Sequence, residues 1–155
     1  MYRKAILLIL LGSSLVRPVL ANCIALEPHA FQLSKAYKWL SINRDNVWQM
    51  SRSLPEGKDR IAMDVRQLVD EVRVQLRPVV VLAMLRRDLR SARDIQTLDD
   101  DFNYEAAGLR EVLSRNAIRL NELAVLESNP AMVSQALSIR DRMQEVDVML
   151  TNCTY

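Results

Sequence analysis

The amino-acid sequence predicts an all-α protein that folds as an antiparallel helical bundle. Glycine, which tight hairpin turns favour, occurs at only three of 155 positions. Apolar residues recur three and four positions apart along most of the chain, and this spacing places them on one face of a helix. Prolines and clusters of capping residues separate these stretches, so the chain divides into successive helical legs.

The first expected helix covers residues 28–54 and has a proline in its first turn, where proline is tolerated. A Pro-Glu-Gly run then ends it. The second helix begins near Asp59 and meets Pro78, which lacks a backbone donor and clashes with the preceding turn. A third segment covers residues 79–98. The expected inward residues are Leu33, Ala36, Tyr37, Leu40, Val47, Met50 and Leu54, then Ile61, Val65, Leu68, Val72 and Leu76, then Leu82, Leu85, Leu89, Ala92 and Ile95.

We interpret the segments on either side of Pro78 as one long leg, kinked at the proline. Several possible N-caps then precede a helix over residues 101–127. Asn129 and Pro130 form an N-cap and first-turn pair for the last helix, whose apolar residues follow a strict seven-residue pattern. The expected inward residues are Leu109, Leu113, Ile118, Leu120 and Leu123 in the fourth segment, and Met132, Ala136, Ile139, Met143, Val146 and Leu150 in the last.

The first 21 residues are typical of a cleaved secretory signal. Two basic residues precede an apolar run at residues 5–11, and Val19-Leu20-Ala21 has the small-residue pattern of a cleavage site. The run is far shorter than the roughly 20 residues of a membrane span. We therefore expect an exported protein, periplasmic or secreted, with one helical domain over residues 22–155.

Loss of the signal changes the charge of the protein. Without Arg3, Lys4 and Arg17, the chain has 18 basic and 19 acidic residues, a net charge of −1. A near-neutral exported protein gives no reason to expect nucleic-acid binding. Lipid attachment at Cys23 and retention of the segment as a membrane anchor are the alternatives to cleavage after Ala21. After cleavage, no membrane association is expected.

The two cysteines, Cys23 and Cys153, lie near opposite ends of the chain. In an oxidising compartment, two cysteines in a small domain are expected to form a disulfide. This bond would place the start of the first helix beside the end of the last, which requires an even number of antiparallel legs. An intermolecular bridge and free thiols are the alternatives.

The sequence offers no conventional catalytic or metal-binding motif. His29 is the only histidine, and no spacing of histidines and cysteines fits zinc or haem. The acidic run Asp99–Asp101 lacks the further ligands of a calcium loop. We therefore expect neither a metal nor a cofactor.

One stretch carries a family resemblance. The residues that carry it are Pro78, Val81, Leu85, Leu89, Ala92, Ile95 and Gln96. In this order and spacing they resemble a helix of exported, gamma-type chorismate mutases. Leu54-Pro55 with Asp59-Arg60 is similar to an earlier turn of that family, and Arg115-x-x-Ile118-x-Leu120-Asn121 to a later segment. The resemblance covers about residues 54–123.

The resemblance implies an isomerase that converts chorismate, a small dicarboxylate, to prephenate without a cofactor. Such an enzyme holds the compact conformer and stabilises the charge that develops on the ether oxygen. The resemblance assigns the ether-oxygen contact to Gln96 and carboxylate binding to Arg60 and Lys38. Arg52 and Arg93 are further candidates for substrate binding.

Two departures from the family leave other interpretations open. Asp88 stands where the family usually has glutamine, and Gln49 where it has lysine, so a diverged or inactive relative is one alternative. The other is a non-enzymatic helical binding protein of the toxin-neutralising, secretion-adaptor or chaperone type. Trp39 and Trp48 would anchor its protein partner if they are exposed. Both interpretations leave room for a homodimer.

Overall fold

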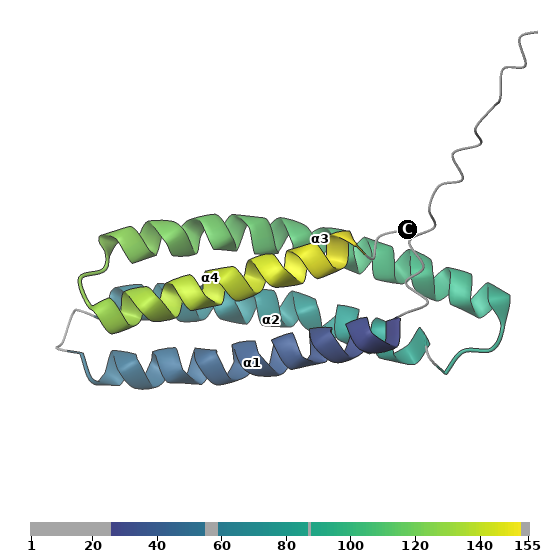
Figure 1. Cartoon of the computed structure of the whole chain (residues 1–155), viewed down its shortest axis with the longest axis horizontal. Coiled ribbons are helices and arrows are strands. Elements are labelled where there is room, and N and C mark those ends of the chain that lie inside the picture. The colour runs from purple at the N-terminus through teal and green to yellow at the C-terminus, as the bar shows by residue number, and fades with distance from the viewer. Residues whose placement is uncertain (1–25, 55–58, 87, 153–155) are drawn as a thin grey trace, which may run out of the picture.

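The structure, a computed structural model, describes residues 26–54, 59–86 and 88–152, and side chains from His29 onward. Four α-helices make up nearly all of this part: α1 (Leu26–Arg52), α2 (Arg60–Arg86), α3 (Ala92–Leu126) and α4 (Pro130–Thr151). They run alternately in opposite directions along one long axis (Figure 1). The predicted all-α class is confirmed, and the helices form an antiparallel bundle.

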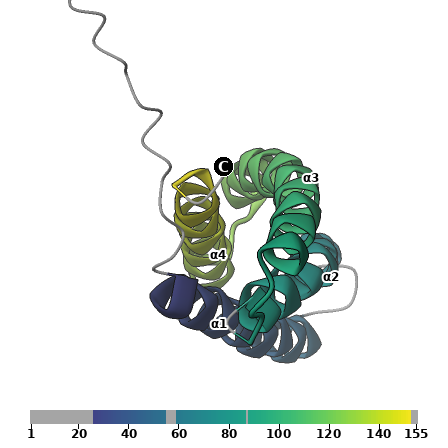
Figure 2. The same ribbon diagram turned by 90° about the vertical axis from the view of Figure 1, so that its right-hand side faces the viewer.

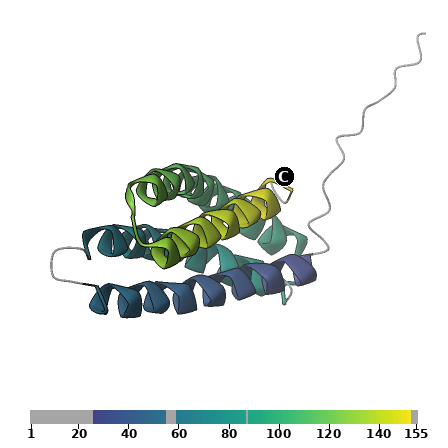
Figure 3. The ribbon, with the colours of Figure 1, turned by 60° about the vertical axis from the view of Figure 1, so that its left-hand side comes forward.

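Helices that follow each other in the sequence lie side by side. α2 packs along α1 on one side and along α3 on the other, while α4 packs along α3 (Figure 2). α1 and α4 contact each other less extensively and complete the ring, as the side view shows (Figure 3). Short connections between consecutive helices favour this antiparallel arrangement.

The core is one apolar cluster to which all four helices contribute. All six inward residues predicted for α4 are buried, as the seven-residue pattern requires. Ile118 was predicted to face inward as well, but 62% of it is exposed. The reason is helical geometry: Ile118 lies two residues before the buried Leu120, about 200° around the helix.

The connection between α2 and α3 differs from the prediction. α2 runs through Pro78, as expected for one long leg, but it ends at Arg86, so the expected end of that leg near residue 98 is wrong. α3 begins at Ala92, nine residues earlier than predicted, after Ser91 in extended conformation with φ −83° and ψ 130°. Arg86 donates to both carboxylate oxygens of Asp99, at 2.5 and 3.0 Å, and thereby fixes the two helices across the turn.

A buried amide fixes α2 against α3. Asn116 is fully buried, and its Nδ2 donates to the backbone carbonyl of Leu68 at 3.1 Å and to Glu71 Oε2 at 3.0 Å. The Glu71 carboxylate also accepts from Arg115. A slip of one helix along the other would leave the amide without these partners, so this network favours a single register.

A matched pair of leucines on α3 tests this description of the core. Leu120→Ala removes a fully buried side chain and should lower the free energy of unfolding by about 2–5 kcal/mol. Leu126→Ala removes a mostly exposed side chain and should change it by less than about 1 kcal/mol. Chemical denaturation measures both values. Equal losses for the two variants would contradict the assigned faces of α3.

Candidate functional site

The residues that the chorismate mutase resemblance assigns lie at different ends of the bundle. Arg52 is in the last turn of α1 and Arg60 is the first residue of α2, whereas Arg93 and Gln96 are in the first two turns of α3. The pairing of Arg86 with Asp99 places the start of α3 beside the far end of α2. α2 has 27 residues and is therefore roughly 40 Å long. One chain does not bring Gln96 and Arg60 together.

All five of these side chains are exposed, including Lys38 in the middle of α1. None of them lines the two grooves described below, between α3 and α4 and between α1 and α4. Cys23, Cys153 and the predicted signal sequence lie outside the described residues. In the part of the chain that the structure describes, no three metal-binding side chains come together, and no helix is long and apolar enough to cross a membrane.

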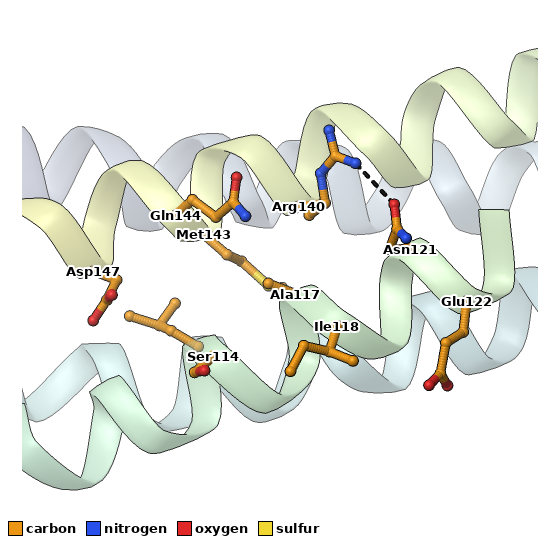
Figure 4. A pocket seen from close by; sticks show the side chains of 10 residues that line it. Ser114, Ala117, Ile118, Asn121, Glu122, Arg140, Met143, Gln144 and Asp147 are labelled. Carbon is orange, nitrogen blue, oxygen red and sulfur yellow. Dashed lines mark hydrogen bonds between the residues drawn. The ribbon is translucent and has the colours of Figure 1, made fainter. Parts of the chain in front are cut away.

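A groove of about 420 Å³ runs between α3 and α4 (Figure 4). Arg140 donates across it to Asn121 Oδ1 at 3.0 Å and also pairs with Asp141 at 2.6 Å. Asp147, at one end, accepts from Arg110 at 3.0 Å. Because these charged groups already have partners and the groove is open, its walls give no poised acid, base or nucleophile.

A second groove, of about 540 Å³, lies between α1 and α4. The Arg142 guanidinium lies 5.6 Å from the centre of the Trp39 ring and pairs with Glu145. The contact with Trp39 joins α4 to α1, so Trp39 belongs to the packing of the bundle rather than to a free surface.

The outward side of α2 has a different character. Val74, Pro78, Val81 and Leu85 are spaced four, three and four residues apart and so share one face of the helix. Val74 is 70% exposed, Leu85 49% and Val81 46%, while the opposite side of the helix forms part of the core. We call these four residues the α2 stripe. Three of its side chains face solvent and Pro78 between them is half-buried, and a contiguous exposed apolar row of this kind is typical of an interaction surface.

Arginines lie along the α1 side of the α2 stripe. Arg66 and Arg73 are seven residues apart, and Arg77 follows one turn after Arg73. Arg66 lies 4.5 Å from the centre of the Trp48 ring, and Arg73 lies 5.4 Å from that of Tyr37. Both aromatic residues belong to α1, so these three arginines lie along the interface between α1 and α2. We call them the arginine row.

Asp70 neutralises the middle of this row. Its Oδ1 accepts from Arg44 Nε at 2.6 Å and from Arg73 Nη1 at 2.9 Å. The hydrogen bonds to Asp70 and then to Asp45 raise the pKa of the Arg44 guanidinium above its ordinary value. The charge of Arg77 has no such partner among the described residues, and it lies directly beside the apolar stripe.

The sequence interpretation missed this surface. It placed Leu85 on an inward stripe with Leu89 and Ala92, because it continued the helix beyond residue 86. The sequence also contains the helical spacing of the apolar residues from Val74 to Leu85, but spacing alone does not show which face of the helix is buried. What the arrangement offers chemically is an apolar ridge bordered by guanidinium groups.

Comparison of the chain with protein-family models, with curated proteins and with solved structures gives no match.

Proposed function

We propose that this chain is an exported, non-enzymatic binding protein that docks an acidic amphipathic helix of a partner protein on the α2 stripe. The observation that carries the proposal is the row of exposed apolar side chains on α2, directly opposite its buried face. An apolar stripe with helical spacing matches the apolar face of a second helix.

The charges beside the stripe support an acidic partner. Arg77 borders the stripe, and two further exposed arginines follow the end of α2: Arg90 in the connection and Arg93 in the first turn of α3. Carboxylates on the flanks of a docked helix would pair with such guanidinium groups and would raise the rate of association. A bend at Pro78, in the middle of the stripe, stays a prediction; it would set the curvature that the partner helix has to follow.

Chorismate mutase activity also stays a prediction. It has less support than the binding proposal, because Gln96 is exposed and lies at the opposite end of α2 from Arg60. Catalysis of this rearrangement needs cations and the amide around one buried substrate. A site that brings these cations and the amide together would need residues from more than one chain.

Photo-crosslinking at matched valines tests the binding proposal. A photoreactive amino acid is placed at Val74, at Val81 or, as the control, at the exposed Val148 on α4. In cells that produce the protein, we expect the same partner to be crosslinked from both α2 positions and not from Val148. Because the partner's acidic flank pairs with the arginine row, Arg77→Glu should reduce this product at least about tenfold. Mass spectrometry of the product identifies the partner.

Other outcomes would contradict the proposal. Equal crosslinking from Val148, or none from the two α2 positions, would reject the α2 stripe as the docking surface. A product of twice the mass of the chain would replace the acidic partner with a second copy. Loss of chorismate absorbance with the purified protein would favour the enzyme instead.

We also propose the Cys23–Cys153 disulfide. The start of α1 and the end of α4 lie at the same end of the bundle, which supports a bond between the segments that adjoin them (Figure 1). Non-reducing digestion of the purified protein should yield one linked pair of peptides that contain the two cysteines. Two reactive thiols, or a dimer that separates on reduction, would contradict an internal bond.

A further inference from the structure

Two arginines share one tryptophan at the end of the bundle where α1 leads into α2. Trp48 is 38% exposed. The guanidinium of Arg66, from α2, lies 4.5 Å from the centre of its ring. That of Arg52, from the last turn of α1, lies 5.8 Å away. The indole therefore brings two positive charges from different helices to one place.

Within the described residues, neither guanidinium has a carboxylate partner. Asp70, one turn after Arg66 on α2, accepts from Arg44 and Arg73 instead. The Nε atom of Arg66 is buried and has no hydrogen-bond partner in the described part of the chain. A buried donor without a partner costs free energy, and two like charges beside one ring repel each other.

Stacking on the indole leaves the edges of the guanidinium groups free to donate. Each guanidinium has five N–H donors in a planar fork, a geometry that matches the two oxygens of a carboxylate. An oxyanion between the two arginines would accept from both and would offset their repulsion. Trp48 would at the same time provide an apolar wall for the carbon atoms next to that group.

We propose that Trp48, Arg52 and Arg66 form a carboxylate-binding site, which takes an acidic side chain of a bound polypeptide. The site lies at the end of the arginine row that follows the α2 stripe. The inference rests on the proposed function only for the source of the carboxylate, because all three residues belong to this chain.

Tryptophan fluorescence tests the site directly. In a Trp39→Phe background Trp48 is the only indole, since the chain has two tryptophans. The probe is tetraglutamate, acetylated and amidated at its ends, added at low ionic strength. We expect a saturable change in Trp48 emission. Arg52→Gln and Arg66→Gln should each weaken binding roughly tenfold, because each removes a charge-assisted hydrogen bond.

A matched control variant distinguishes binding at this site from a general effect of the positive charge of the protein. Arg119→Gln removes the same charge from an exposed arginine on α3, outside the arginine row, and should leave tetraglutamate binding unchanged. Equal weakening by Arg119→Gln, or no saturable change in the parent, would overturn the site. Saturable binding of inorganic phosphate without binding of tetraglutamate would overturn the carboxylate assignment.

Arg66 also contributes to packing of α2 on α1 through Trp48, so a thermal melt accompanies each variant. If Arg66→Gln does not fold, Arg52→Gln decides the outcome, because the Arg52 side chain is exposed. Tetraglutamate binding without crosslinks at Val74 and Val81 would keep this site and reject the proposed function. Crosslinks without tetraglutamate binding would do the reverse.

Discussion

The burial of one face of α2 between α1 and α3 is the constraint on which the rest of this structure depends. Val65, Val69, Val72 and Leu76 are fully excluded from solvent, and each buried valine or leucine stabilises the fold by about 1.5–3 kcal/mol. A helix that packs on two neighbours has only its outermost side left for solvent. The position of the exposed apolar residues from Val74 to Leu85 is thus a consequence of how the core is built.

The two flanks of α2 stabilise its register by different means. On the α3 side, the buried Asn116 Nδ2 donates to the carboxylate of Glu71, which also accepts from Arg115, while Asn116 Oδ1 has no hydrogen-bond partner among the described residues. On the α1 side, arginines stack on aromatic rings. Among the described residues, Asp70 is the carboxylate of α2 that pairs with them. The α3 side is therefore joined by polar pairs, whereas on the α1 side the guanidinium groups of Arg52 and Arg66 contact Trp48 and have no carboxylate partner in the described part of the chain.

Much of the fold could be predicted from the sequence because its strongest signals are local. The seven-residue pattern of α4 and its N-cap Asn129 needed no knowledge of the other helices, and Asn129 Oδ1 accepts from the backbone of Ala131 at 3.0 Å. The predicted position of the turn before α3 was wrong, because apolar residues with helical spacing continue across this turn. Ser91 followed three residues later by Asp94 was the available start signal.

The candidate site was harder to predict, since its contacts join different helices. Trp48 and Arg66 are far apart in the sequence, and only the register of α1 against α2 brings them together. In the sequence alone the arginines of α2 resemble a solvated face. The family resemblance assigned residues by their positions along the sequence. The bundle places Arg52 and Arg60 at one end, and Arg93 and Gln96 at the other.

The most direct test of this account is the stability of a variant in which Val74, Val81 and Leu85 are all replaced by glutamine. These side chains face solvent, so the free energy of unfolding of the isolated protein should change by no more than about 1 kcal/mol. The single core substitution Val72→Gln should cost considerably more, because it buries a polar amide. A loss of about 3 kcal/mol or more in the triple variant would contradict the account, since it would mean that the stripe is packed in the folded chain.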